Sequence, residues 1–436
     1  MPLVTIMLNS RIKKIMTAIT KNTVFGDLIK PVHVALEHVR YHSKRFTSIP
    51  MEDFISLGVL RHLQQTTTLR EQVQGLFHLT EESESKLPVA RSTLSDALSS
   101  KYRLQIIVQA QQQLVCHAQD VLPDRLENIP GLGTRSVYAM DGTYQKEGSH
   151  YSPCTPSQGG NDNSKGHALI AIYNARLGCP QDVHIDTRSR HEIKMLRDYA
   201  ALPGSVMNTK NALWLVDRAF IDAPYWDQAK CKKGVTMITR MKKGLVIEQK
   251  RAREVKLDKL NQGVCRDEDI LLKSSKSVWR LISYTTENGD KLEFLTNEMK
   301  LEPGVIAFLY LRRWDEEKCF DTWKNDFSQA KAWGISHTAI ENQARLAIIT
   351  SLLVAIFMNE KMLEFGIGDE KAIEKREKRM NNDQSEFVPM MWFHKLYGHI
   401  SKVSRQVLRF LKLNFNRKSS HMLYNTHLRL MLLRDI

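Results

Sequence analysis

The order of apolar and polar positions divides the chain of 436 residues into three parts. Up to about residue 130, apolar residues recur at i, i+3 and i+4, most clearly over 51–77, which indicates amphipathic helices. From residue 131, short runs rich in β-branched and aromatic residues predict strands with helices between them. Beyond residue 300 the helical spacing returns. The pattern therefore predicts a mixed α/β core with helical regions on both sides.

The middle part holds the predicted core. Strands are expected at 137–140, 166–175, 181–187, 212–216 and 235–241, and helices at 190–202 and from residue 222. Residues 212–216 (ALWLV) are all apolar, as in a strand that is buried on both faces. Strands that come first and then alternate with helices are typical of a mixed sheet covered by helices.

Changes in composition predict five segments. They are an N-terminal helical region (1–130), a first part of the core (131–242), a β-rich insertion (243–300), a second part of the core (301–358) and a basic helical C-terminal region (359–436). The ENGD stretch at 287–290 predicts a hairpin within the insertion, in which Gly289 supplies a positive φ.

The charge indicates what the chain binds. Its formal net charge is +15, and residues 371–436 alone contain 14 Lys or Arg against 5 Asp or Glu. Such an excess favours a polyanionic partner, most simply nucleic acid; the alternative is a basic protein without a nucleic-acid role. Near the N-terminus, Ser92 or Thr93 is a candidate cap for a helix, either of a DNA-reading helix-turn-helix or of an ordinary helical bundle.

Other features argue against several classes of protein. The six cysteines show no CxxC spacing, which argues against a zinc site and favours reduced thiols in the cytosol. The N-terminal residues lack the apolar centre of a signal peptide. The longest apolar run, at 346–358, has 13 residues, so we expect a buried core helix and no membrane span.

One predicted helix, at 305–330, carries a chemically unusual stripe. At 100° per residue, Tyr310, Arg313, Glu317 and Lys324 share an arc of about 60°. A carboxylate flanked by cations suits a metal ligand beside phosphate-binding groups, whereas the alternative is a salt-bridged amphipathic helix.

Two further carboxylates follow apolar strands. Asp141 comes directly after 137–140, and Asp217 directly after 212–216. If these strands are parallel neighbours, both side chains emerge at the same end of the sheet, where open α/β sheets place their sites. The alternatives are a hairpin turn at Asp141-Gly142 and, for Asp217, a helix cap or an ion pair with Arg218. Together with Glu317, the two aspartates form a set of hard oxygen ligands that suits Mg²⁺ or Mn²⁺, in phosphodiester cleavage by two ions.

The spacing Tyr310-x2-Arg313-x3-Glu317-x6-Lys324 resembles the YREK signature of the insertion sequence four family of DDE transposases. The resemblance includes Asp141-Gly-Thr, Asp217-Arg and the β-rich insertion, and it covers roughly 137–335. It implies an RNase H-like mixed sheet, in agreement with the strands predicted above.

The resemblance also implies roles for single residues. Asp141, Asp217 and Glu317 would hold two divalent ions, while Tyr310, Arg313 and Lys324 would grip the element-end DNA. Trp314 is a candidate for stacking on a displaced base, and Trp279 is either a base-capturing wedge or a core residue of the hairpin. Arg218 either supports Asp217 or contacts DNA, and Lys242 and Lys243 are candidate phosphate contacts. Asp321 is the alternative third ligand.

These features predict a cut-and-paste DNA transposase that acts on the ends of an insertion sequence and on target DNA. Pairing of two ends implies a homodimer on DNA, and the expected location is the prokaryotic cytoplasm, on the nucleoid. Two alternatives stay open: an RNase H-like nuclease that cuts without strand transfer, and a DNA-binding protein derived from a transposase.

Overall fold

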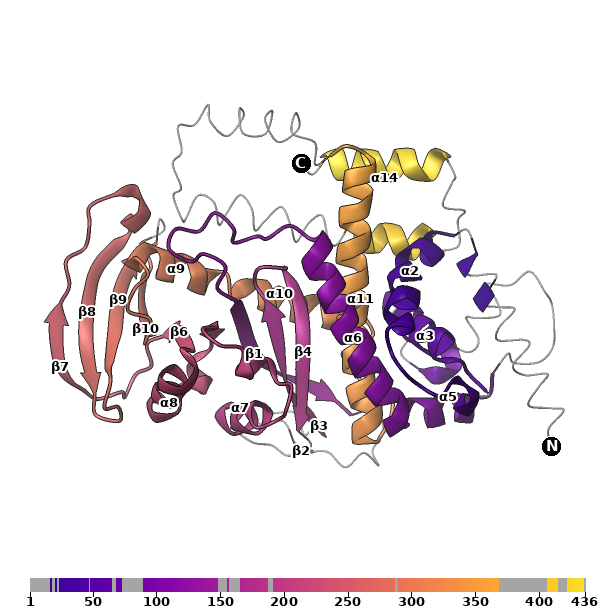
Figure 1. Cartoon of the computed structure of the whole chain (residues 1–436), viewed down its shortest axis with the longest axis horizontal. Helices are drawn as coiled ribbons and strands as arrows, with labels where there is room; N and C mark the ends of the chain where they lie inside the picture. The colour runs from indigo at the N-terminus through magenta and orange to yellow at the C-terminus, as the bar shows by residue number, and fades with distance from the viewer. Residues whose placement is uncertain are drawn as a thin grey trace.

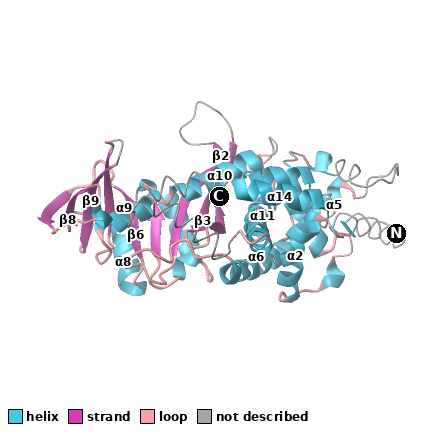
Figure 2. Ribbon diagram, turned by 90° about the horizontal axis from the view of Figure 1, so that it is seen from above, coloured by secondary structure: helices cyan, strands magenta, loops and turns pink. Residues whose placement is uncertain are grey.

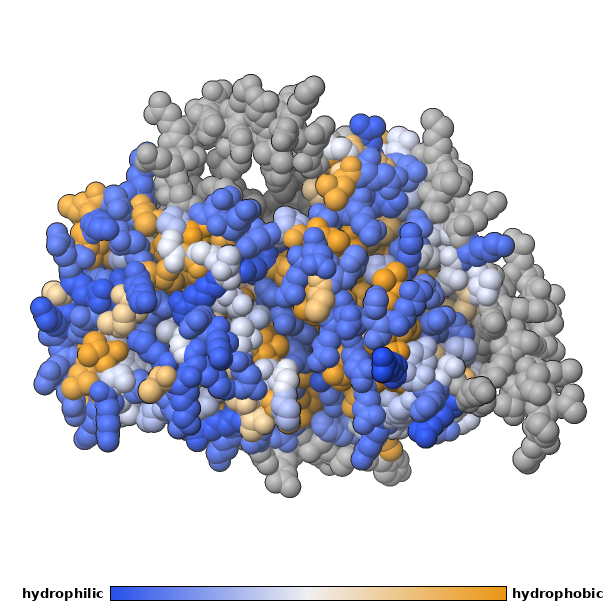
Figure 3. All heavy atoms as spheres, viewed as in Figure 1, coloured by the Kyte–Doolittle hydropathy of each residue, from blue (hydrophilic) through white to orange (hydrophobic). Residues whose placement is uncertain are grey.

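The computed structural model has a sheet lobe and a helical lobe side by side (Figures 1 and 2). It describes residues 16–17, 20–21, 23–46, 48–64, 68–72, 89–147, 155–156, 165–186, 191–286, 289–367, 406–414 and 422–434. Hydrophilic residues cover most of the face drawn in Figure 3, and apolar residues appear there as small separate patches.

The sheet lobe is built on one continuous mixed sheet. Its strands are β1 (Val137–Lys146), β2 (Thr155–Pro156), β3 (Lys165–Asn174), β4 (Cys179–Asp186), β5 (Leu213–Val216), β6 (Thr236–Arg240), β7 (Ile247–Ala252), β8 (Val264–Leu272), β9 (Val278–Thr285) and β10 (Lys291–Thr296). In the core the order is β4-β3-β1-β5-β6, with β3 antiparallel to both neighbours and β1, β5 and β6 parallel. This is the strand order of an RNase H-like fold, and the predicted fold class is confirmed.

Helices cover both faces of this sheet. Side chains alternate along a strand, so Val137 and Ala139 pack with α9 (Pro303–Leu311) on one face. Tyr138 and Met140 pack on the other face with α7 (Glu192–Ala200) and α8 (Ala223–Lys233). The alternation decides where the next residue of β1 points, which positions the candidate site.

The insertion extends the same sheet instead of forming a separate one. β10 pairs with β6, and β9, β8 and β7 follow in antiparallel order. The predicted hairpin lies between β9 and β10, and Gly289 has the expected positive φ of 84°. β8 was not predicted, because its VCRDEDILL sequence is too charged to resemble a buried strand.

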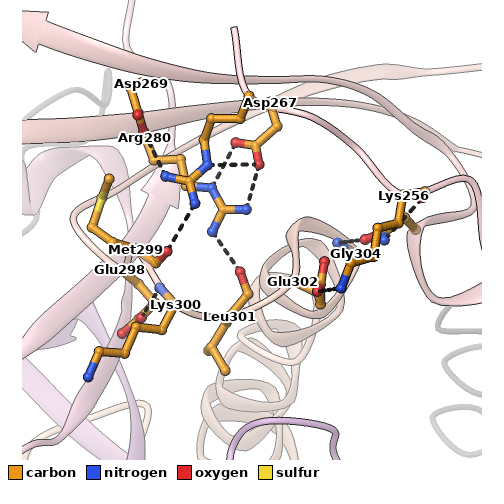
Figure 4. A network of polar contacts seen from close by, with 12 residues as sticks. Lys256, Asp267, Asp269, Arg280, Glu298, Met299, Lys300, Leu301, Glu302 and Gly304 are labelled. Carbon is orange, nitrogen blue, oxygen red and sulfur yellow. Dashed lines mark hydrogen bonds and ion pairs between the residues drawn. The ribbon is translucent and has the colours of Figure 1, made fainter. Parts of the chain in front are cut away.

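A buried ion pair fixes the insertion to the segment that leads into α9 (Figure 4). Arg280 of β9 donates to Asp267 of β8 at 2.7 Å and to the carbonyl oxygen of Leu301 at 2.6 Å. Both charged side chains are almost fully buried. Because one guanidinium contacts two strands and the connecting segment, the insertion is held in a fixed position relative to α9.

The helical lobe joins regions from both ends of the chain around one long helix. It contains α2 (Val24–Glu37), α3 (Met51–Gln64), α5 (Arg91–Leu98), α6 (Lys101–Val121), α11 (His337–Glu364), a helical segment at 406–414 and α14 (Met422–Arg434). They share one hydrophobic core, which also includes residues of β3 and β4. α5 begins at Arg91 after an Ala90 N-cap, so the predicted caps at Ser92 and Thr93 lie one to two residues inside the helix.

α11 contains the apolar run that the sequence placed in a core helix. By length and composition alone it could cross a membrane, but 56% of its most apolar window is buried inside the molecule. It packs against α3, α5, α6 and β4. This is the packing of a core helix, and length and composition by themselves are weak grounds for a membrane span.

Candidate active site

Strand pairing brings the two predicted aspartates together. β1 and β5 are parallel, with Met140 opposite Val216, so Asp141 and Asp217 follow adjacent positions on neighbouring strands. Neighbouring strands lie about 4.8 Å apart. By alternation, both residues fall on the α9 face of the sheet, since Ala139 and Leu215 pack there. The prediction that the two strands are parallel neighbours is confirmed.

The structure does not support the alternatives for these aspartates. β1 continues through Asp141 and Gly142 to Lys146, and both residues pair with β3, so there is no hairpin turn at this point. Asp217 precedes a short 3₁₀ helix (Arg218–Phe220), but its side chain makes no capping hydrogen bond. Its carboxylate also forms no ion pair within the described part of the chain. Asp217 is half-buried.

Arg313 contacts one of the two aspartates, whereas the resemblance implied that it grips DNA. Its Nη1 is 3.3 Å from Oδ2 of Asp141, and its side chain is only 7% exposed. Its guanidinium carbon lies 5.6 Å from the ring centroid of Tyr310, which is itself buried and packs against Phe294. Burial raises the pKa of the Tyr310 hydroxyl. The ring of Tyr310 therefore packs against the guanidinium of Arg313, and Tyr310 does not lie on the surface.

The helix predicted at 305–330 is interrupted twice. α9 ends at Leu311, α10 runs over Trp314–Asp321, and a π-helical turn occupies Thr322–Asp326. A uniform step of 100° per residue therefore does not hold over 305–330. The prediction that Tyr310, Arg313, Glu317 and Lys324 share one arc of a regular helix is wrong. π-helical turns inside helices occur frequently at functional sites.

The structure tests only some of the predictions for α10 and the turn that follows it. α10 packs against β1, the strand of Asp141. The side chains of Trp314 and Glu317 lie outside what the structure describes, and their roles stay predictions. Lys324 and Asp321 are exposed to solvent.

Sequence analysis missed one carboxylate, Glu192. It is the first residue of α7, on the opposite face of the sheet from Asp141. A methyl group at Gly142 would overlap its carboxylate, so the absence of a side chain there lets Glu192 reach the sheet. Burial, then repulsion by Asp141 and Asp217, raises the pKa of Glu192 to about 7. No local motif marks it, since only the packing of α7 on the sheet brings it to the site.

Trp279 is not where a base-capturing wedge would be. Its side chain is fully buried between the sheet and α8, and its indole nitrogen donates to Asp227 at 3.0 Å. Trp279 is therefore a core residue of the hairpin, which was the alternative prediction. The expectation that it contacts DNA is wrong. Arg218, by contrast, is exposed next to Asp217 and lies free to contact a ligand.

The donor atoms at this edge suit a hard divalent cation. Asp141 and Asp217 offer carboxylate oxygens, and repulsion by these two carboxylates adds to the burial that raises the pKa of Glu192. Within the described residues, no group of three His, Cys, Asp or Glu side chains is arranged to hold a metal. A third ligand would have to come from a side chain such as that of Glu317.

Comparisons with known proteins agree with this arrangement. A family model described as the transposase DDE domain matches residues 132–353, just over half of the chain. A protein of Sinorhizobium fredii (strain NBRC 101917 / NGR234) named "Putative transposase y4zB" is 22% identical over 202 residues, which are 45% of this chain and 54% of that protein. The match thus spans about half the length of this relative.

Among solved structures, the chain is similar to the piggyBac transposase in its synaptic complex with hairpin DNA. The TM-score is 0.41 at 8% identity, over 96% of this chain and 85% of that one. The matched family region includes β1, β5, α9 and α10, and therefore both aspartates and the helix of Glu317. The chain belongs to the transposase DDE domain family.

Proposed function

We propose that the chain is a DNA transposase of the insertion sequence four family, which cuts the ends of a mobile element and joins them to target DNA. The observation that supports this most is the parallel pairing of β1 with β5. It sets Asp141 and Asp217 side by side within the matched family region, and α10, which carries Glu317, packs against β1.

In this proposal Asp141, Asp217 and Glu317 hold two divalent ions, Mg²⁺ or Mn²⁺. Bound ions of this kind supply an activated water and stabilise the leaving oxygen in an in-line displacement at phosphorus. Arg313 orients the carboxylate of Asp141 through the 3.3 Å contact. The exposed ammonium of Lys324 binds a phosphate near the cut, and Trp314 stacks on a displaced base.

The proposed partners are double-stranded DNA at the element ends and at the target. The net charge of +15 favours such a polyanion. Two ends must be held together before they are joined, so we propose a homodimer on DNA, in the prokaryotic cytoplasm.

The test is excision and joining from a plasmid that carries the flanks of the coding region, with Mg²⁺ or with EDTA. Wild-type protein should give excised and joined products only with metal. Glu317→Gln should abolish both, whereas Glu316→Gln, at the neighbouring carboxylate, should retain them. Asp321→Asn tests the alternative third ligand.

Three results would contradict the proposal in different ways. Cutting without joining would favour the RNase H-like nuclease, and binding without cutting would favour a DNA-binding protein. Full activity of Glu317→Gln with loss in Asp321→Asn would move the third ligand to Asp321.

A further inference from the structure

The sheet edge that carries the two aspartates continues into the insertion. β1, β5 and β6 are parallel and end at this edge. β10 begins there, β9 ends there and β8 begins there, because each of these strands is antiparallel to its neighbour. The insertion therefore lengthens the edge on which Asp217 lies.

A groove of about 760 Å³ follows this edge from Arg218 to β8. That volume lies in the range of ligand-binding pockets, about 300–1,000 Å³. Its basic lining residues come from four strands or the loops beside them: Arg218, Arg240, Lys242, Lys243, Arg266 and Lys291. Glu293 is the one carboxylate in its lining. The groove is therefore strongly positive.

None of these six basic side chains forms a hydrogen bond or ion pair with another described residue, and all but the half-buried Arg240 are exposed. Two other arginines of the insertion differ. Arg280 pairs with Asp267, and Arg253 pairs with Asp269 at 2.8 Å. Like charges that lie close together without partners favour binding of a polyanion.

The floor of the groove adds an unsatisfied hydroxyl. The side chain of Ser283 on β9 is 9% exposed, and its Oγ has no hydrogen-bond partner in the described part of the chain. A buried hydroxyl without a partner costs about 1–3 kcal/mol. A phosphate oxygen that enters the groove would accept this hydrogen bond.

We propose that this groove binds the sugar–phosphate backbone of the DNA strand next to the cut. The proposal rests on the transposase function above. From β5 to β8 the edge crosses four strand spacings, about 19 Å, or roughly five nucleotides of a B-form strand. The groove contacts backbone and not bases, because Tyr284, its one aromatic lining residue, is buried.

The test measures binding of the full chain to a fluorescein-labelled 40-base-pair duplex in EDTA, by anisotropy over a series of salt concentrations. The groove variant combines Arg240→Gln, Lys242→Gln, Lys243→Gln and Lys291→Gln, and leaves Arg218 beside Asp217 intact. The matched control removes four exposed lysines from the opposite edge of the same sheet lobe: Lys210→Gln, Lys232→Gln, Lys273→Gln and Lys276→Gln.

We expect the groove variant to bind at least about 100-fold more weakly at 100 mM salt, with a salt slope lower by about 3–4. The control should change the slope by less than about 1. A thermal melt of each variant verifies folding, and Lys243→Glu alone, at an exposed loop position, should still lower the slope by about 1–2.

Equal binding by the groove variant and the control would overturn this inference, even if the wild type cuts and joins DNA. Failure of the transposase function is a separate result, in which wild-type protein binds the duplex but never cuts it with Mg²⁺. A labelled single strand, tested in parallel, shows whether the groove holds one strand by itself.

Discussion

At the scale of the residue, Arg313 shows how burial changes a predicted role. The resemblance implied that Arg313 contacts DNA. Its guanidinium is instead buried, between the ring of Tyr310 and the carboxylate of Asp141. A cation in this position lowers the cost of placing Asp141 and Asp217 next to one another. Arg313 therefore contacts a proposed metal ligand directly, which the sequence did not predict.

Another buried residue, His62 in α3, makes the stability of the helical lobe depend on pH. It is fully buried, and its Nε2 lies 3.2 Å from the carbonyl oxygen of Gln343 in α11. Burial lowers the pKa of His62 to about 3. The folded state therefore resists protonation, and its stability falls as the pH drops below the unfolded value of about 6.5 towards 3.

The expected loss from His62 between pH 7.5 and pH 5 is about 2 kcal/mol. Urea unfolding of wild type and His62→Gln at both pH values measures it, because the variant lacks this contribution. The exposed His33 provides the control, and His33→Gln should keep the wild-type pH dependence. The explanation fails if His62→Gln loses as much stability on acidification as the wild type does.

At the scale of the element, periodicity predicted most strands and helices of the sheet lobe. Apolar runs such as 212–216 are strong signals, because a strand buried on both faces tolerates few polar residues. β8 gave no such signal, since its four consecutive charged residues at 266–269 place polar side chains on both of its faces. The π-helical turn at Thr322–Asp326 could not be predicted either, because tertiary packing and not local spacing sets where a helix shifts its register.

The candidate site, like the fold, could be predicted from the sequence only in part. Asp141 and Asp217 stand directly after apolar runs, so their position followed from the order of those runs. Glu192 did not follow, since it reaches the sheet only through the packing of α7 over Gly142.

The start of α9 lies close to the insertion, as Figure 4 shows in part. A methyl group on Gly304 would overlap the carbonyl oxygen of Leu260 in the 3₁₀ turn Lys259–Asn261. The backbone cannot move aside as a side chain can, so Gly304→Ala should lower the free energy of unfolding by about 3 kcal/mol or more. Since α9 leads into α10, metal-dependent DNA cutting should also fall.

Thermal unfolding monitored by circular dichroism checks this loss. Glu302→Ala, two residues away, removes only an exposed ion pair with Lys256 and should cost less than about 1 kcal/mol. Unfolding of Gly304→Ala at the wild-type temperature would contradict the close packing of α9 on the insertion.

At the scale of the whole molecule, the two lobes share one core. Residues of β3 and β4 pack in the same hydrophobic cluster as the helices, and Arg345 of α11 adds a polar joint. Its Nη1 lies 3.1 Å from Asp182 of β4, and its Nε 2.9 Å from Glu341 of its own helix. Tyr199 of α7 also donates to Asp182, at 2.7 Å. The joint therefore links α11, β4 and α7.

Arg345→Met should destabilise both lobes together. The change leaves Asp182 and Glu341 without their shared cation in a largely buried site, which costs about 3–5 kcal/mol. Because the hydrophobic core spans both lobes, urea should still unfold the variant in one transition, with the same midpoint by circular dichroism and by tryptophan fluorescence. Lys361→Met, on the same helix, loses a pair with the half-exposed Glu364 and a contact 5.8 Å from the Phe357 ring centroid, and should shift the midpoint far less. Two separate midpoints in the wild type would instead mean that the helical lobe unfolds independently of the sheet, which would contradict a hydrophobic core shared by both lobes.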